Sequence, residues 1–345
     1  MGKKYTTLKD IARSLGVSTT TVYKVLHGHP DISKSTREKV LKAIEEFGYI
    51  KNEIASTLRS AKTNAIGFIV PEISNPFYEP VILGMTQATR DRGYDLFIVN
   101  LPRNRKEDID KAIENLMMRR MDGIIIAANI TQLDERDFRR YRLKERAIAF
   151  GLAFPTTFMD VITPNNFKGG YIATKHLIDI GRKRIAILHA SDFEKERNLK
   201  ERFQGYIKAL KDHGMNLNKE LIFVEKEPSG RTNSMFEAYD LIRKKIKEVK
   251  FDAIFCYNDE LAYGAIEALK DENVEIPEDV AIVGYDDLEF SKLISPSLTS
   301  VKFDKYHLGY RAVEMLLERL ENPSMEPRLE LVDVDLVIRE STAGV

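Results

Sequence analysis

The sequence has a single cysteine, no long hydrophobic run and no net charge, and each shortage excludes a class of protein. Cys256 is alone among 345 residues, so no internal disulfide can form, which is typical of a reducing compartment. No apolar run reaches the roughly 18 residues that a transmembrane helix needs. The basic start lacks the apolar segment of a secretory signal. We therefore expect a cytoplasmic protein with no membrane partner.

The balanced total charge conceals an uneven distribution. The chain has 53 basic and 53 acidic residues, yet residues 1–60 carry 11 Lys and Arg against 6 Asp and Glu. This N-terminal segment therefore has a charge of +5, and the rest of the chain carries −5. A basic segment on an acidic body favours contact with phosphate, although a chance excess on a solvated surface explains the charge alone equally well.

Residues 7–48 have the periodicity of three short amphipathic helices. Thr7, Ser18 and Ser35 are the expected N-caps, and Glu38 is expected to complete a capping box with Ser35. The expected buried faces are Leu8, Ile11, Ala12 and Leu15 in the first helix, Val22, Val25 and Leu26 in the second, and Val40, Leu41, Ile44 and Phe47 in the third.

The second of these helices has a polar face opposite its apolar one. That face carries Thr19, Thr20, Lys24 and His27, and the helix follows a tight turn at Gly16. A helix that enters the major groove needs this division, because one side packs on its own domain while the other reaches base edges. The pattern indicates a helix-turn-helix, and an ordinary small helical domain is the alternative.

From residue 65 onward, apolar strands alternate with amphipathic helices, which predicts parallel sheets with helices on both faces. The strands fall into two series that look like a duplicated unit, so the body is expected to be α/β with two Rossmann-like lobes and a ligand cleft at the strands' carboxyl ends. The first series is Ala65–Val70, Tyr94–Val99, Gly123–Ala127 and Ala147–Phe150, and the second is Arg184–Leu188, Leu221–Val224, Ala253–Tyr257 and Val280–Gly284.

Short motifs along the whole chain point to one family. They are Thr7-Leu-Lys-Asp-Ile-Ala12, Gly16-Val-Ser18, Thr21-Val22, Val25-Leu26, Gly28, Ser35-Thr-Arg-Glu-Lys-Val40, Gly48-Tyr49, Asn52, Ala55, Leu58-Arg59 and Leu336-Val-Ile-Arg-Glu-Ser-Thr342. Together they resemble the lac repressor/galactose repressor (LacI/GalR) family of bacterial transcription regulators.

The resemblance implies a division of the chain into three parts. Residues 1–49 would form an all-α helix-turn-helix headpiece, and residues 50–62 a hinge helix or linker. Residues 63–345 would form a periplasmic-binding-protein-like body for effector binding and dimerisation. Its N-terminal lobe is expected at about 63–160 and 292–322, and its C-terminal lobe at about 161–290 and 323–340.

The resemblance also implies a surface for operator DNA. Leu58 matches a leucine that wedges into the minor groove in this family, and a flexible linker with Leu58 packed on the core is the alternative. Tyr23-Lys24 replaces the family's usual Ser-Arg, and Lys24 lacks the bidentate fork of arginine, so the operator sequence is expected to differ from the family consensus. The residues expected to contact DNA are Thr19, Thr20, Tyr23, Lys24, His27 and Leu58.

Polar and aromatic side chains follow the expected strands of the body, where the cleft would open. Arg, Asn and Asp offer the donors and acceptors that bind a sugar or polyol, and aromatic rings stack on its apolar face. The resemblance assigns effector binding to Arg202, Asn258 and Asp286, and more loosely to Phe77 and Tyr78.

An enzyme, an exported sugar-binding protein and a regulator controlled by a phosphocarrier protein are the alternatives. The sequence has no phosphate-binding, dinucleotide-binding or nucleophile-elbow motif, and its six histidines show no metal spacing. We therefore expect no catalytic residue, metal or cofactor. The headpiece opposes the exported protein. The favoured hypothesis is a homodimeric, DNA-binding regulator, typically a repressor in this family, with a sugar or polyol effector between its lobes.

Overall fold

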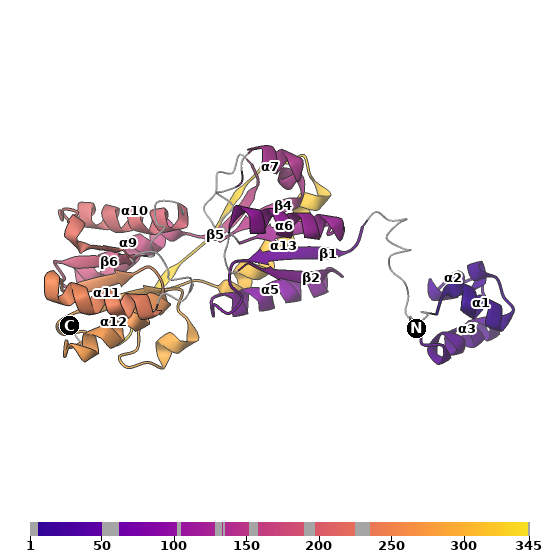
Figure 1. Cartoon of the computed structure of the whole chain (residues 1–345), viewed down its shortest axis with the longest axis horizontal. Helices are drawn as coiled ribbons and strands as arrows, with labels where there is room; N and C mark the ends of the chain where they lie inside the picture. The colour runs from indigo at the N-terminus through magenta and orange to yellow at the C-terminus, as the bar shows by residue number, and fades with distance from the viewer. Residues whose placement is uncertain are drawn as a thin grey trace. The chain divides into compact units, whose positions relative to one another are not determined.

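The computed structural model of the chain describes residues 6–49, 62–101, 105–127, 133, 135–151, 158–189, 197–224 and 235–343. The chain divides into two compact units, Met1–Thr63 and Asn64–Val345 (Figure 1). Most of the expected hinge, including Leu58, lies outside the described residues. No helix in the described ranges is long and apolar enough to cross a membrane.

The described part of the first unit contains three helices, α1 (Leu8–Leu15), α2 (Thr19–Leu26) and α3 (Lys34–Glu46). Thr7 begins α1 through a capping box, because its Oγ1 accepts from the Asp10 N–H at 3.3 Å and Asp10 Oδ2 accepts from the Thr7 N–H at 2.9 Å. Gly16 ends α1 at φ +65°, which turns the chain sharply into α2. Ser18 Oγ caps α2 by accepting from the Thr21 N–H at 3.0 Å.

The third helix begins earlier than the sequence predicted. Its N-cap is Ser33, whose Oγ accepts from the Thr36 N–H at 3.2 Å. Ser35 lies inside the first turn, so the predicted capping box between Ser35 and Glu38 is wrong. Ser33 is also a capping residue type, and its extended backbone lets the chain leave the preceding loop and enter the helix there.

One apolar face from each helix forms the core of the first unit. Two side chains predicted to be buried in α3 are instead exposed, Leu41 by 49% and Phe47 by 45%. The core stripe runs through Val40 and Ala43, and residue 41 projects about 100° away from residue 40 around the helix. The buried members of the core are Ile11, Ala12, Val22, Val25, Val40 and Ala43.

The second unit contains two sheets, each with six strands in the described part of the chain (Figure 1). The first sheet has the order β11-β5-β4-β3-β1-β2 and the second β12-β10-β9-β8-β6-β7, which is the same order for a duplicated unit. All pairings are parallel except that of β12 with β10. The strands are β1 (Ala65–Val70), β2 (Asp95–Asn100), β3 (Gly123–Ile126), β4 (Ala147–Phe150), β5 (Asp160–Pro164), β6 (Ile185–His189), β7 (Ile222–Val224), β8 (Ala253–Cys256), β9 (Ala281–Tyr285), β10 (Thr299–Lys302), β11 (Leu329–Val332) and β12 (Asp335–Val337).

Helices cover the sheets, and two pairs of them cross at glycines. A Cβ on Gly84 would lie 2.0 Å from the Tyr306 carbonyl oxygen, and one on Gly170 would lie 2.1 Å from the Arg202 carbonyl oxygen. These close approaches bring α5 against α13 in one lobe and α9 against α10 in the other. The helices are α5 (Tyr78–Asp91), α6 (Lys106–Met118), α7 (Glu135–Arg140), α8 (Leu143–Arg146), α9 (Asn166–Asp179), α10 (Arg197–Asp212), α11 (Met235–Glu248), α12 (Asp259–Asp271) and α13 (Lys305–Glu321).

The lobe boundaries differ from the predicted ones. Strand β10 belongs to the second sheet, although the sequence placed residues 292–322 in the N-terminal lobe. Strand β11 belongs to the first sheet, although residues 323–340 were placed in the C-terminal lobe. The chain therefore crosses between lobes after β5, after β10 and after β11. The strands at these crossings are short, and β11 is only half-buried, so they lack the continuous apolar signal of the strands that were predicted.

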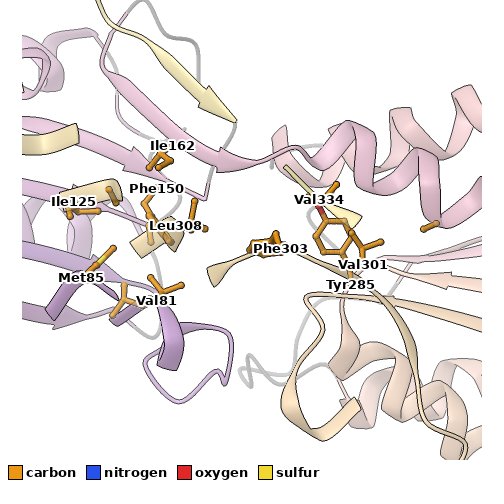
Figure 2. Packing of buried hydrophobic residues seen from close by; sticks show 14 of the residues in the cluster. Val81, Met85, Ile125, Phe150, Ile162, Tyr285, Val301, Phe303, Leu308 and Val334 are labelled. Carbon is orange, nitrogen blue, oxygen red and sulfur yellow. The ribbon is translucent and has the colours of Figure 1, made fainter. Parts of the chain in front are cut away.

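A single hydrophobic cluster includes residues of both lobes. Figure 2 shows Phe303, from the segment between β10 and α13, lying between the cluster members of the two lobes. Val81, Met85 and Phe150 lie on the side of the first lobe, and Tyr285 on the side of the second. Packing through Phe303 therefore connects the lobes directly.

A buried ion pair holds the C-terminal end of α13 against the first sheet. Arg319 and Asp160 are almost completely buried, and their side chains form two hydrogen bonds of 2.8 and 3.0 Å. The backbone N–H of Arg328 also donates to Asp160 Oδ1 at 2.8 Å, so the same carboxylate fixes the residue that directly precedes β11. Both groups are satisfied, as buried charges must be.

Candidate functional site

The polar face of α2 lies opposite the core of the first unit, as predicted. Thr19, Thr20 and His27 are exposed, whereas Val22 and Val25 are buried. Small hydroxyl side chains on the first turn of a helix can approach base edges closely. The arrangement is the one that a helix in the major groove requires.

Two of the side chains expected to contact DNA, Tyr23 and His27, contact each other on α2. The rings of Tyr23 and His27 stack with centroids 4.0 Å apart. His27 Nδ1 lies 2.8 Å from the Tyr23 carbonyl oxygen, which can only accept, so Nδ1 carries the proton and donates. The hydrogen bond thereby fixes the imidazole and leaves Nε2 for an outside partner.

Lys24, the expected base-reading cation, is half-buried and forms an ion pair with Asp31 in the loop after α2. The hydrogen bond from the Lys24 ammonium lowers the pKa of the Asp31 carboxyl below its ordinary value. The structure thus brings Thr19, Thr20, Tyr23, Lys24 and His27 onto one element, and Leu58 lies outside the described residues.

In the second unit, Arg202 of α10 is the centre of a buried polar group. Its Nε donates to Asn166 Oδ1 at 2.8 Å and its Nη1 donates to the Tyr257 carbonyl oxygen at 2.5 Å. The guanidinium also lies over the ring of Tyr285, 3.4 Å from the centroid, and 4.3 Å from the ring centroid of Tyr257. The rings of Tyr257 and Tyr285 and the side-chain amide of Asn166 therefore fix the orientation of the guanidinium.

Asp286 faces this cation from the end of β9. Its Oδ1 lies 3.9 Å from Arg202 Nη2, which is too long for a hydrogen bond. That oxygen is buried and has no hydrogen-bond partner among the described residues. Burial raises the pKa of Asp286 to about 6, and Arg202 and Lys305 partly offset the shift. An unsatisfied buried acceptor beside a fixed donor is suited to a ligand hydroxyl.

Aromatic rings link the predicted residues of the first lobe to this group. Phe77 packs against Tyr78, with centroids 4.9 Å apart, and against Phe303 at 6.1 Å. Phe303 in turn lies 6.1 Å from Tyr285, whose ring carries the Arg202 guanidinium. The structure therefore connects Phe77 and Tyr78 with Arg202 and Asp286 through two further rings.

Three residues of this group, His189, Phe203 and Asn166, were missed by the sequence reasoning. His189 ends β6 and is buried, with its ring centroid 5.4 Å from that of Phe203. Burial and the neighbouring Arg202 lower the pKa of His189 to about 3, so the ring is neutral. Asn166 begins α9 and accepts from Arg202. His189 follows the strand-end rule that selected Asp286, so that signal was present in the sequence.

Asn258, which was predicted to bind the effector, has a structural role in the fold. Its Oδ1 caps α12 by accepting from the Leu261 N–H at 2.9 Å. The next residue, Asp259, is fully buried and accepts from the Leu288 N–H at 2.7 Å and from Ser291 Oγ at 2.6 Å. These bonds hold the loop that carries Asp286.

A polar contact joins the two lobes beside the same group. Asn75, which precedes α5, donates from Nδ2 to Glu260 Oε2 of α12 at 3.1 Å. Burial, together with the charges of Asp286 and Glu72, raises the pKa of Glu260 to about 7. No cluster of three or more His, Cys, Asp or Glu that could hold a metal ion occurs in the described ranges.

The basic helical headpiece and the two-lobed body define a DNA-binding regulator with an effector domain. Residues 7–52 match the family model of bacterial regulatory proteins of the lacI family, and residues 63–340 match that of periplasmic binding proteins and the sugar binding domain of the LacI family. The chain therefore belongs to the LacI family of DNA-binding transcriptional repressors.

Similar proteins extend over nearly the whole chain. The HTH-type transcriptional repressor PurR of Pasteurella multocida is 34% identical over 340 residues, covering 97% of this chain and 98% of that protein. The lac repressor dimer bound to operator and the anti-inducer ONPF is 25% identical, with a TM-score of 0.86 and coverage of 98% and 99%. The cellobiose complex of the regulator CelR is 26% identical, with a TM-score of 0.70 and coverage of 97% and 99%. These relatives are regulators rather than enzymes.

Proposed function

We propose that the chain is a homodimeric repressor whose affinity for an operator is controlled by a small sugar or polyol. The observation that carries the proposal is the Arg202–Asp286 pair, in which Asp286 Oδ1 is buried without a hydrogen-bond partner among the described residues. A guanidinium donor and a carboxylate acceptor side by side match the adjacent hydroxyl groups of a polyol. The aromatic rings of Phe77, Tyr78 and Phe203 would contact its apolar face.

The similar structures support this ligand class. CelR was solved with cellobiose, and the same family model describes a sugar binding domain. His189 strengthens the proposal, since a neutral imidazole in the group offers a donor or an acceptor to a hydroxyl without adding charge. A neutral ligand needs no further ionic partner beyond the Arg202–Asp286 pair.

On the DNA side, we assign the reading of base edges to Thr19, Thr20 and Lys24. Tyr23 and His27, fixed by their stacking, are assigned to contacts beside them. Leu58 is assigned to the minor-groove wedge, from the resemblance alone. The +5 charge of residues 1–60 supports docking on phosphates.

A second copy of the chain is the expected partner of the body. Large apolar side chains are exposed on both lobes, including Phe97 at 44%, Phe236 at 62% and Leu293 at 79%. Among the described strands, β2 lies at the edge of its sheet, where a further strand can pair. The lac repressor, which this chain resembles over its whole length, was solved as a dimer. Two headpieces would then read a pseudo-palindromic operator.

Ligand binding would act through the contacts that join the lobes. The lobes are joined by three crossing segments, by the Phe77–Phe303 contact and by the Asn75–Glu260 hydrogen bond. A ligand between the lobes would contact both of them beside these connections. A ligand that favours one arrangement of the lobes shifts the spacing of the headpieces, and hence the affinity for the operator.

Calorimetric titration of the full chain with monosaccharides, disaccharides and polyols tests the effector class. We expect one of these compounds to bind with a stoichiometry of one per chain. Tight binding of a nucleobase or nucleoside, with no affinity for any sugar or polyol, would contradict the proposal. A response of operator binding to a phosphocarrier protein alone would favour the alternative controller.

A further inference from the structure

The ion pair between Lys24 and Asp31 connects the recognition helix to the loop that follows it. Lys24 projects from the polar face of α2, and its ammonium donates to Asp31 Oδ2. The two side chains are 37% and 52% exposed, so the pair lies at the surface where DNA would dock. The expected base-reading cation is therefore already held by an acid before any DNA binds.

The loop that carries Asp31 is itself fixed on both sides. Arg37 of α3 donates from Nη2 to the His29 carbonyl oxygen at 2.5 Å, and the His29 N–H donates to the Lys24 carbonyl oxygen at 3.0 Å. Two residues after Asp31, Ser33 caps α3. Asp31 is thus presented to Lys24 from a tethered loop rather than from a free one.

An ammonium group differs from a guanidinium because its donors turn freely. Lysine has three donors on a flexible stem and lacks the planar fork with which arginine binds the two acceptors of guanine. When one of the three donors is bound to a fixed carboxylate, the other two can point only in a restricted set of directions. A tethered acid can therefore give lysine some of the directionality of arginine.

We propose that Asp31 is a specificity-determining positioning residue, which orients Lys24 toward a base edge and keeps its charge from the DNA backbone. This inference rests on the proposed role of Lys24 in reading bases. The backbone phosphates of any DNA, cognate or not, would attract a free ammonium. The Asp31 carboxylate competes with the phosphates for the Lys24 ammonium and repels them. A base edge can accept hydrogen bonds from the two remaining N–H groups of Lys24 without breaking the ion pair.

The test compares operator DNA, selected from a random pool, with a random-sequence duplex of the same length, using the full chain. Asp31→Asn should bind the random duplex more tightly and lower the ratio of operator to random affinity on the order of tenfold, the scale of one lost base contact. Asp31→Glu keeps the charge and should retain most of the ratio. Glu45→Gln, which removes an exposed acid of α3 outside the pair, is the charge-matched control and should change the ratio by less than about twofold, because such a charge is screened.

A second background separates positioning from a simple charge effect. In Lys24→Gln chains, Asp31→Asn should have no larger effect than Glu45→Gln, because Asp31 would have no ammonium left to orient. An Asp31→Asn effect equal to that of Glu45→Gln in the normal background, or an undiminished effect in the Lys24→Gln background, overturns the inference. Either result leaves sequence-specific binding intact, whereas failure to select any operator refutes the proposed function itself.

Discussion

At the scale of single residues, the proposed effector site contains two charged side chains, Arg202 and Asp286, that differ in how many partners they have. Arg202 has its guanidinium fixed by Asn166, by the Tyr257 carbonyl and by two aromatic rings. Asp286 Oδ1 is buried and, among the described residues, has no hydrogen-bond partner; Arg202 Nη2 lies 3.9 Å from it. The site is therefore preorganised on the donor side and unsatisfied on the acceptor side, which is the asymmetry that a ligand hydroxyl relieves.

The first prediction concerns Asp286. The ionised carboxylate accepts more strongly from a hydroxyl than the protonated acid does, and burial raises the pKa of Asp286 to about 6. Effector affinity should therefore fall as the pH is lowered from 7 to 5, because the carboxyl gains a proton over that range. Asp286→Asn should weaken effector binding by about 2 kcal/mol, as for a hydrogen bond to a charged group, and should flatten the pH dependence. Calorimetry at several pH values measures both effects.

Comparing the pH dependence of the unmodified chain with that of Asp286→Asn separates the titration of Asp286 from that of neighbouring carboxyl groups. Burial raises the pKa of both Asp259 and Glu260 to about 7, so those groups titrate nearby. If the Asp286→Asn chain kept the full pH dependence, the proton would belong to one of them and the assignment to Asp286 would be wrong.

Not every residue of the site was accessible from the sequence. Asp286 and Arg202 were both predicted from the family resemblance, and Asp286 also follows a predicted strand. Asn166 and Phe203 were missed because they lie on helices, and only packing shows that they face the ends of strands. Asn258 was predicted as a site residue at a strand end, but the sequence did not show that it is also the N-cap of the following helix.

At the scale of elements, the first four strands of each sheet along the chain were predicted and the two later ones were not. All eight strands of the two predicted series exist, to within one or two residues. Strands β5, β10, β11 and β12 were not predicted, because short strands near lobe crossings carry mixed apolar and polar residues. The positions of the crossings depend on those strands, which is why the lobe boundaries were wrong.

The second prediction concerns the buried pair that holds α13 on the first sheet. Asp160→Ala would leave Arg319 as an uncompensated buried charge and would also remove the acceptor of the Arg328 N–H. The free energy of unfolding of the body should fall by roughly 3–5 kcal/mol. Asp179→Ala, which breaks the exposed pair with Lys175, should cost less than about 1 kcal/mol. Urea unfolding followed by circular dichroism compares the two, and equal losses would contradict the role of Asp160.

The third prediction concerns the hinge, and it comes from the family resemblance because Leu58 lies outside the described residues. If Leu58 wedges into the minor groove, Leu58→Ala should weaken operator binding by about 2 kcal/mol, the contribution of one buried leucine side chain. Affinity for random DNA, which depends on phosphates, should barely change. DNA bending measured by energy transfer between end labels should also decrease. Unchanged bending and affinity would leave the segment as a tether.

At the scale of the whole molecule, the same chain has to carry a signal from the body to the headpiece. The lobes share one hydrophobic cluster through Phe303, and three chain crossings join them (Figure 2). A ligand bound at Arg202, as proposed, would touch the group that includes Tyr285, Phe303 and Phe77, and so would contact residues of both lobes together. We therefore expect effector binding and operator binding to be coupled while they use separate residues.

This coupling can be measured by fluorescence anisotropy of a labelled operator titrated with the full chain. The titration is done in the presence and absence of the effector found by calorimetry. We predict that the effector changes the operator Kd at least fivefold, a typical lower limit for allosteric coupling. Arg202→Met should abolish that change while leaving the operator Kd of the effector-free protein within about twofold, because Arg202 lies in the body. An effector that binds with full affinity and leaves the operator Kd unchanged would contradict the account.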